Sequence, residues 1–139
     1  MIGARGVIRD EAGRYLLIKR TDSGIWAFPA GGMEIGESLV ECAIRETYEE
    51  TGLKAAIATP FALYSGPQDT HTNTFNHTYQ YVILACLLTD VSGELRPDPH
   101  EATEAGWFSP ADFPNQGPSM RRTLADIEAF ETTGRLQVY

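Results

Sequence analysis

The stretch from Ala30 to Leu53 constrains the fold most, because a glycine-rich loop leads directly into a helix that ends in an acidic patch. Ser38, followed three residues later by Glu41, is the pattern of a capping box, which predicts that the helix begins at Leu39. Gly52 predicts its end, because glycine readily takes the left-handed conformation that closes many helices. The apolar residues between these two signals form the stripe that should pack against a sheet.

Three glutamates of this helix, Glu46, Glu49 and Glu50, stand at positions i, i+3 and i+4. They share one face of the helix within an arc of roughly 100°. Arg45 can pair with Glu49, but one arginine does not offset three carboxylates that repel one another by roughly 0.2–0.5 kcal/mol per pair. A run of charge is usually a solvated face. The alternative is a site for a hard divalent cation, because carboxylates opposite a loop of backbone carbonyls supply the oxygen ligands that Mg²⁺ takes.

Eight residues of this stretch stand at defined gaps over 23 positions: Gly31, Glu37, Arg45, Glu46, Glu49, Glu50, Gly52 and Leu53. This pattern resembles the Nudix box, the signature of the Nudix hydrolase family. The resemblance implies an α+β fold in which a mixed β-sheet lies between helices, an α/β/α sandwich. It also implies an enzyme, a MutT-like pyrophosphohydrolase that acts on phosphoric anhydrides.

The resemblance further implies which residues carry the chemistry. Glu46, Glu49 and Glu50 are expected to bind Mg²⁺ or Mn²⁺, and one of them, or an acidic residue of a later loop, to act as the general base. Arg45 belongs to the same catalytic set. Ala30 stands where the family often has a glycine whose carbonyl binds the metal, and alanine supplies a carbonyl equally well.

Other residues are expected to complete or support this site. In the resembling family, an acidic residue shortly before an aromatic strand often adds a metal ligand or a base. Glu101 and Glu104 are the candidates here, with Glu101 favoured and a solvated loop as the alternative. Glu37 is expected to orient the arginine of the helix and to brace the loop, while Gly31 and Gly52 give the loop and the helix end their shape.

Composition and charge exclude several classes of protein. The net charge of −8 disfavours a nucleic-acid groove, which needs clustered Lys and Arg, but bound metal ions would still admit a phosphate substrate. Cys42 and Cys86 are too few for a disulfide framework, so we expect buried free thiols and a cytoplasmic protein. No stretch reaches the roughly 20 apolar residues that cross a membrane. Residues 1–139 should form one domain, and a homodimer stays open because some members of the resembling family pair through N-terminal strands.

Along the rest of the chain, alternating and apolar runs predict strands. Ile2–Arg9 and Tyr15–Ile18 should pair as a hairpin, and further strands are expected over 57–64, 79–88 and 106–108. Ser119 should cap a last helix that runs to about Thr133, because Gly134 follows it.

A polar loop over residues 65–76 has about the length at which loops tend to be functional or mobile. Phe75 in this loop could stack on a base, and His77 and Tyr79 could contact a base or sugar. Arg20, at the end of an expected strand, could reach a substrate phosphate. For each of the four, a plain surface position is the alternative.

The resemblance implies a nucleotide-type substrate, a nucleoside diphosphate linked to another moiety. An ADP-ribose or nucleotide-sugar type is the first choice, and a nucleoside triphosphate is the second. A module that senses a nucleotide without cleaving it is a different class, and it predicts a damaged Nudix box. Cleavage of RNA 5′ ends would need a basic channel, which the overall charge disfavours.

Overall fold

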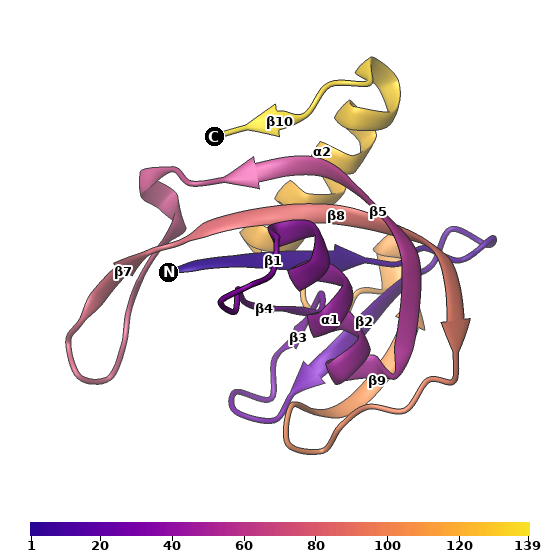
Figure 1. Cartoon of the computed structure of the whole chain (residues 1–139), viewed down its shortest axis with the longest axis horizontal. Coiled ribbons are helices and arrows are strands. Elements are labelled where there is room, and N and C mark those ends of the chain that lie inside the picture. The colour runs from indigo at the N-terminus through magenta and orange to yellow at the C-terminus, as the bar shows by residue number, and fades with distance from the viewer.

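The chain forms a five-stranded mixed sheet between two α-helices, with a three-stranded antiparallel sheet beside it (Figure 1). These features come from a computed structural model that describes residues 1–139. The elements in chain order are β1 (Ile2–Val7), β2 (Tyr15–Arg20), β3 (Trp26–Ala27), β4 (Ala30–Gly32), α1 (Leu39–Thr51), β5 (Leu53–Tyr64), the 3-10 helix η1 (Pro67–Asp69), β6 (Thr70–Thr72), β7 (Thr78–Gln80), β8 (Val82–Gly93), β9 (Ala102–Phe108), the 3-10 helix η2 (Pro110–Asp112), α2 (Pro118–Thr133) and β10 (Gln137–Val138). The predicted α+β class, a mixed sheet with helices, is confirmed.

The mixed sheet has the strand order β10-β5-β8-β1-β4. Strand β1 runs parallel to β8 and β10 runs parallel to β5, whereas β4 is antiparallel to β1 and β8 is antiparallel to β5. The register of β5 on β8 shifts just after Pro60, a residue that has no N–H to donate to the ladder. Residues 30–32, the start of the glycine-rich loop, form β4, and because β4 is the edge strand next to β1, this loop lies at the margin of the sheet.

The two helices cover opposite faces of the mixed sheet, as neighbouring residues of β1 show. A Cβ added to Gly6 would lie 2.0 Å from Thr47 Oγ1 of α1, so this face of the strand lies directly against α1. The neighbouring Arg5 points the other way, because its guanidinium donates to the hydroxyls of Ser119 and Thr123 in α2. Successive residues of a strand face opposite sides, so β1 lies between the two helices.

Apolar side chains bury on both faces. The cluster on the α2 side includes Met120 and Ile127 of α2. The cluster on the α1 side includes Cys42, Ala43 and Cys86, and both cysteines are buried free thiols as predicted. Burial raises the pKa of Cys42 to about 11 and that of Cys86 to about 12. Neither α-helix combines the length and the apolar character needed to cross a membrane.

Helix α1 has the predicted bounds. Ser38 Oγ accepts a hydrogen bond from the backbone N–H of Glu41 at 3.2 Å, and the Glu41 carboxylate accepts one from the backbone N–H of Ser38 at 2.7 Å. The helix ends at Gly52, which is left-handed with φ of 80° and donates its N–H to the carbonyl of Tyr48 at 2.8 Å. Both ends are therefore fixed by local sequence signals.

Replacing Gly52 by Ala should lower the free energy of unfolding by about 2–3 kcal/mol, because alanine in the left-handed region costs about 1–2 kcal/mol and its Cβ would also meet a neighbour. The added Cβ would lie 2.6 Å from the carbonyl oxygen of Glu94. Gly134 is the matched control, since its φ is 70° but no atom lies within 4 Å of an added Cβ. Gly134→Ala should cost only about 1 kcal/mol. Urea unfolding measures both, and equal losses would show that the contact with Glu94 has no effect.

The predicted hairpin of the first two strands is wrong. Strand β1 pairs with β4 and β8, whereas β2 pairs with β3 and β9 in the other sheet. Only Arg9 and Tyr15 form a bridge next to the turn. A turn signal between two strands predicts that the chain reverses, but the burial of each strand decides which distant strand becomes its partner.

The predicted cap of the last helix is also wrong. Helix α2 begins at Pro118 with Gly117 as its N-cap, and proline is favoured at the first helical position because it needs no N–H partner there. Ser119 lies within the first turn, and its hydroxyl accepts a hydrogen bond from Arg5 instead. The end of the helix at Gly134 is confirmed.

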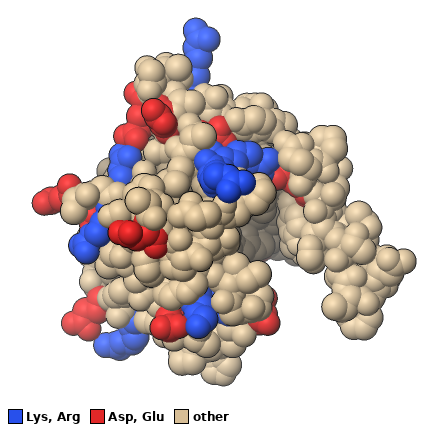
Figure 2. Space-filling model, turned by 180° about the vertical axis from the view of Figure 1, so that it is seen from behind, with Lys and Arg blue, Asp and Glu red and all other residues tan.

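The predicted polar loop over 65–76 contains regular structure. It forms η1 and β6, and β6 pairs with β7 as a small hairpin. This hairpin stands out from the body of the molecule, and the surface is hollowed at its base (Figures 1 and 2). The following strand, β8, consequently begins at Val82 rather than at Tyr79.

Candidate active site

The acidic face of α1 lies against the glycine-rich loop. A Cβ added to Gly31 would fall 2.1–2.3 Å from the carboxyl group of Glu46, a separation that no real Cβ allows. Only glycine therefore lets the loop and this carboxylate approach so closely. The side chain of Glu46 is mostly buried in this contact, whereas that of Glu49 is 45% exposed.

Arg45 links the helix to the loop, because its guanidinium donates to acceptors on both. Its Nε and Nη2 donate to both carboxylate oxygens of Glu37 at 2.8 and 2.7 Å, a bidentate pair. Its Nη1 donates to Glu46 at 2.9 Å and to Glu49 at 3.1 Å, and its Nη2 also donates to the carbonyl of Gly32 at 2.9 Å. The hydrogen bonds from Arg45 are the main reason that the pKa of Glu37 falls to about 2. The pairing of Glu37 with Arg45, predicted from the sequence, is present.

Glu50 is the most unusual acid of the chain. It is only 2% exposed, and its Oε2 has no hydrogen-bond partner. Burial is the main cause that raises its pKa to about 8, and the nearby carboxylate of Glu46 adds to the rise while Arg20 opposes it. An unpartnered buried carboxylate oxygen costs free energy, and a cation beside it would remove that cost.

The residues of this face fit a divalent cation by their chemistry, although no three His, Cys, Asp or Glu side chains converge into a ready-made ligand group. Four carboxylates gather around Arg45 instead, those of Glu34, Glu37, Glu46 and Glu49. The unpartnered oxygen of Glu50 and the contact of Glu46 with Gly31 favour an ion between helix and loop. Glu46, Glu49, Glu50 and the carbonyl of Ala30 would hold it.

Of the two later acids, Glu101 lies within electrostatic reach of two α1 glutamates. Its charge contributes to raising the pKa values of Glu46 and Glu50 and that of Arg20. Glu101 lies just before β9, where its carbonyl accepts a hydrogen bond from the N–H of Thr21 at 3.2 Å. Glu104 instead pairs with Lys19 on the neighbouring strand at 3.1 Å. Glu101, the favoured candidate, therefore lies near the acidic site, whereas Glu104 is held in an ion pair with the neighbouring strand.

Arg20 also lies at the site, although its guanidinium is held by Asp22 at 2.8 Å. With Ala30 and Gly31 it lines a cavity of about 350 Å³ that opens beside the loop. Its charge lowers the pKa of Glu50, which requires the two groups to be near one another. This position is compatible with the predicted contact to a phosphate.

The three predicted contacts from the hairpin lie elsewhere. Phe75 is 80% exposed, and His77 and Tyr79 are exposed as well. The hydroxyl of Tyr79 accepts from the side chain of Asn73 at 3.3 Å, within the hairpin itself. None of the three lines the cavity beside the loop or the larger cavity on the α2 side of the sheet.

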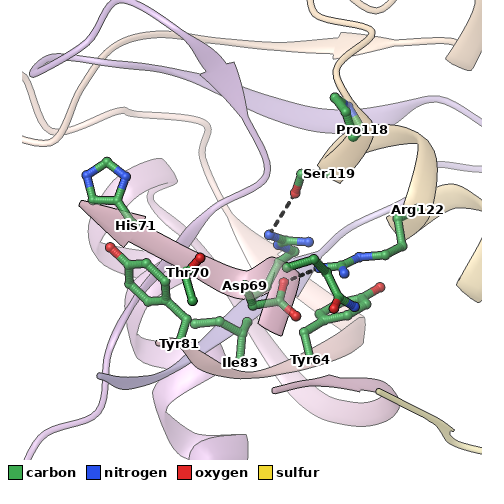
Figure 3. A pocket seen from close by; sticks show the side chains of 11 residues that line it. Tyr64, Asp69, Thr70, His71, Tyr81, Ile83, Pro118, Ser119 and Arg122 are labelled. Atoms are coloured by element: carbon green, nitrogen blue, oxygen red, sulfur yellow. Dashed lines mark hydrogen bonds and ion pairs between the residues drawn. The ribbon is translucent and has the colours of Figure 1, made fainter. Parts of the chain in front are cut away.

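Sequence reasoning missed a second, larger cavity of about 850 Å³ on the α2 side of the mixed sheet (Figure 3). Its walls come from β1, the end of β5, the segment from η1 to β8 and the first turns of α2. Arg5 and Arg122 both reach it, and Figure 3 shows Arg122 paired with Asp69. The signal available was Arg5, a lone charge inside a strand of small and apolar residues.

Comparisons with known proteins match the chain to one family. A family model described as NUDIX domain matches residues 1–127. A Bacillus subtilis protein with the provisional name 8-oxo-dGTP diphosphatase is 29% identical over 127 residues, which cover 91% of this chain and 78% of that protein. The NAD-capped RNA hydrolase NudC of Vibrio cholerae is 32% identical over 78% of this chain but only 39% of its own length. The crystal structure of a MutT NUDIX hydrolase from Burkholderia pseudomallei superposes with a TM-score of 0.75 at 28% identity, covering 91% of this chain and 96% of the other.

Proposed function

The chain belongs to the NUDIX domain family and is a pyrophosphohydrolase, and we propose that it cleaves the diphosphate bridge of a nucleoside diphosphate linked to another moiety, with the help of Mg²⁺ or Mn²⁺. The observation that carries this proposal is Glu50, whose buried oxygen has no partner beside the loop that Arg45 holds. A substrate of the ADP-ribose or nucleotide-sugar type is favoured, because a cavity large enough for a second moiety adjoins the smaller cavity that the loop lines.

In the proposed reaction, the residues of the chain position charge around the diphosphate. Divalent ions, when bound, neutralise the diphosphate and stabilise the leaving phosphate. Arg45 keeps Glu46 and Glu49 on the side of the loop, and Arg20 is placed to contact a phosphate oxygen. One buried carboxylate takes the proton of the attacking water, and Glu50 is the first candidate because it is buried beside the loop with an oxygen that has no partner.

A nucleoside triphosphate is the second candidate substrate, and the Bacillus subtilis relative named for 8-oxo-dGTP supports it. A sensor without activity is disfavoured, because the Nudix box is intact at all eight positions. The relative that acts on NAD-capped RNA is more than twice as long as the stretch that this chain matches, so RNA stays outside the proposal.

A phosphate-release screen tests this function. Nucleotide sugars, dinucleotides and nucleoside triphosphates would each be incubated with the protein in Mg²⁺, in Mn²⁺ and in chelator. We expect cleavage of diphosphate-linked substrates only when metal is present. Binding of the same nucleotides without any cleavage in metal would favour the sensor.

Replacing Gly31 by Ala should lower turnover by roughly 10- to 100-fold, because the new Cβ would displace the carboxyl group of Glu46, and a misplacement of about 1 Å can cost that much. Gly32 is the matched control, since its added Cβ would have only the carbonyl oxygen of Ile2 nearby, at 4.0 Å. Gly32→Ala should keep turnover within about twofold. Steady-state kinetics on one substrate from the screen measures both, and an equal effect at the two glycines would contradict the assigned place of Glu46.

A further inference from the structure

The larger cavity adjoins the smaller cavity beside the glycine-rich loop. It shares Tyr81 and Ile83 with the smaller cavity that Ala30 and Arg20 line, so a molecule bound at the loop could extend into it. Its volume of about 850 Å³ lies in the range of small-molecule sites. Figure 3 shows polar side chains pointing into it from both sheet and helix. The cavity is therefore placed to receive the part of a substrate beyond the diphosphate.

Arg5 has hydrogen-bond donors to spare in this cavity. Its Nη1 donates to Thr123 Oγ1 at 2.6 Å and its Nη2 to Ser119 Oγ at 3.2 Å. A guanidinium has five N–H donors in a planar fork, so about three are left for another acceptor. No carboxylate forms a salt bridge with Arg5, unlike Arg122, whose partner is Asp69.

The charges around the cavity do not balance. Arg5 and Arg122 both lie over the ring of Tyr64, with guanidinium carbons 5.6 and 4.2 Å from its centre, and Asp69 is the only carboxylate in the lining. The cavity thus holds one positive charge in excess, in a chain whose net charge is −8. Burial lowers the pKa of Arg5, and the charge of Arg122 lowers it further, whereas Tyr64 and Asp69 oppose the change. A bound anion would supply the negative charge that balances this guanidinium.

The position of Arg5 fixes which part of a substrate it can reach. Arg5 stands directly opposite Ala30 in the antiparallel pair of β1 and β4, where partner Cα atoms lie about 4.5–5.5 Å apart. Its side chain extends from there toward α2, away from the glutamates of α1. A group bound by Arg5 would therefore lie about one side-chain length from Ala30, where the proposed function places the diphosphate.

We propose that Arg5, with the hydroxyl of Ser119, binds an anionic group, a phosphate or a carboxylate, on the moiety beyond the hydrolysed diphosphate. A planar guanidinium suits such a group because it can donate two parallel hydrogen bonds to it. This inference rests on the proposed function and makes it narrower. The preferred substrate carries an extra acidic group outside the bond that is cleaved.

Matched substrate pairs test this proposal. Each pair shares one diphosphate and differs by one acidic group: NADPH and NADH, coenzyme A and dephospho-coenzyme A, UDP-glucuronate and UDP-glucose. For at least one pair, kcat/KM should favour the acidic member by about 10- to 100-fold, the size expected of a hydrogen bond to a charged group. Arg5→Gln should bring this ratio to near one by raising KM for the acidic member, and Arg5→Lys should keep part of it.

Arg121 gives the control, because it lies on the same helix as Ser119, donates to the carbonyl of Gln116 and does not line the cavity. Arg121→Gln should leave the ratio unchanged. Calorimetric binding of adenosine 2′,5′-bisphosphate and adenosine 3′,5′-bisphosphate, each compared with AMP, provides a readout that needs no hydrolysis. Tighter binding of a bisphosphate that Arg5→Gln abolishes would support the anion site even if no substrate were cleaved.

Three results would overturn the proposal. Ratios near one in all pairs, with no bisphosphate bound more tightly than AMP, would exclude an anion site while leaving the hydrolase intact. A preference for one base over another that disappears in Arg5→Gln would assign the arginine to the base instead. A ratio that falls equally in Arg121→Gln would show a general charge effect.

Discussion

Glu50→Gln should lower kcat by on the order of 10²–10⁴, the range for losing a general base. Glu50 is buried beside the glycine-rich loop, with a raised pKa and an oxygen that no protein group satisfies. Glutamine has nearly the same shape, so packing should be kept while both proton acceptance and cation binding are lost. Steady-state kinetics with saturating Mg²⁺ or Mn²⁺ measures the effect.

Glu41→Gln is the matched control on the same helix. Glutamine at this position can still complete the capping box with Ser38, so both stability and turnover should stay near those of the unchanged chain. Near-native turnover of Glu50→Gln on every substrate that the chain cleaves would contradict the role assigned to this carboxylate.

Glu50→Gln should also change how the free energy of unfolding depends on pH when a chelator removes metal. The pKa of Glu50 is about 8 in the native state against an ordinary value of 4.5, so between these pH values the native state binds more protons than the unfolded state. Stability contributed by this group is therefore full below about pH 4.5 and is lost as pH rises toward 8. Urea unfolding at several pH values should show this loss in the unchanged chain and a flatter profile in Glu50→Gln.

Asp126→Ala should lower the free energy of unfolding by about 3–4 kcal/mol. Asp126 is 3% exposed and accepts hydrogen bonds from the hydroxyls of Tyr64 at 2.7 Å and Tyr139 at 2.5 Å. Each hydrogen bond to a charged group contributes about 1.5–3 kcal/mol, and the buried Tyr64 hydroxyl would lose this acceptor. The substitution also releases the contact between α2 and Tyr139, the residue that follows β10.

Tyr139→Phe separates the two hydrogen bonds, because it removes one donor and leaves the contact between Asp126 and Tyr64 in place. It should cost about 1–2 kcal/mol, roughly half of the loss in Asp126→Ala. Urea unfolding at neutral pH measures both variants. A loss below about 1 kcal/mol in Asp126→Ala would show that water replaces the carboxylate without penalty.

The parts of the structure that local signals decide could be predicted from the sequence. The capping box at Ser38 and the left-handed Gly52 fixed both ends of α1, and helical spacing placed Glu49 within reach of Arg45. These outcomes depend on residues a few positions apart, so no distant part of the chain could alter them.

The parts that depend on distant contacts could not be predicted. Strand β1 pairs with β8, about 80 residues away, rather than with the strand that follows it. The strand predicted over 79–88 is divided, since Tyr79 lies in the exposed β7 and β8 begins only at Val82. The cavity around Arg5 was invisible for the same reason, since its walls come from β1, β5 and α2 and meet only in the folded chain.

Because side chains alternate along β1, substitutions at two neighbouring positions should have different consequences. Gly6 cannot be replaced by a larger residue, because α1 lies directly against it. Its neighbour Arg5 instead borders a cavity on the other face of the sheet. Substitution of residue 5 during evolution could therefore change the preferred substrate without disturbing the packing of α1 and its glutamates. The choice of substrate and the conserved chemistry would then depend on two consecutive residues of one strand.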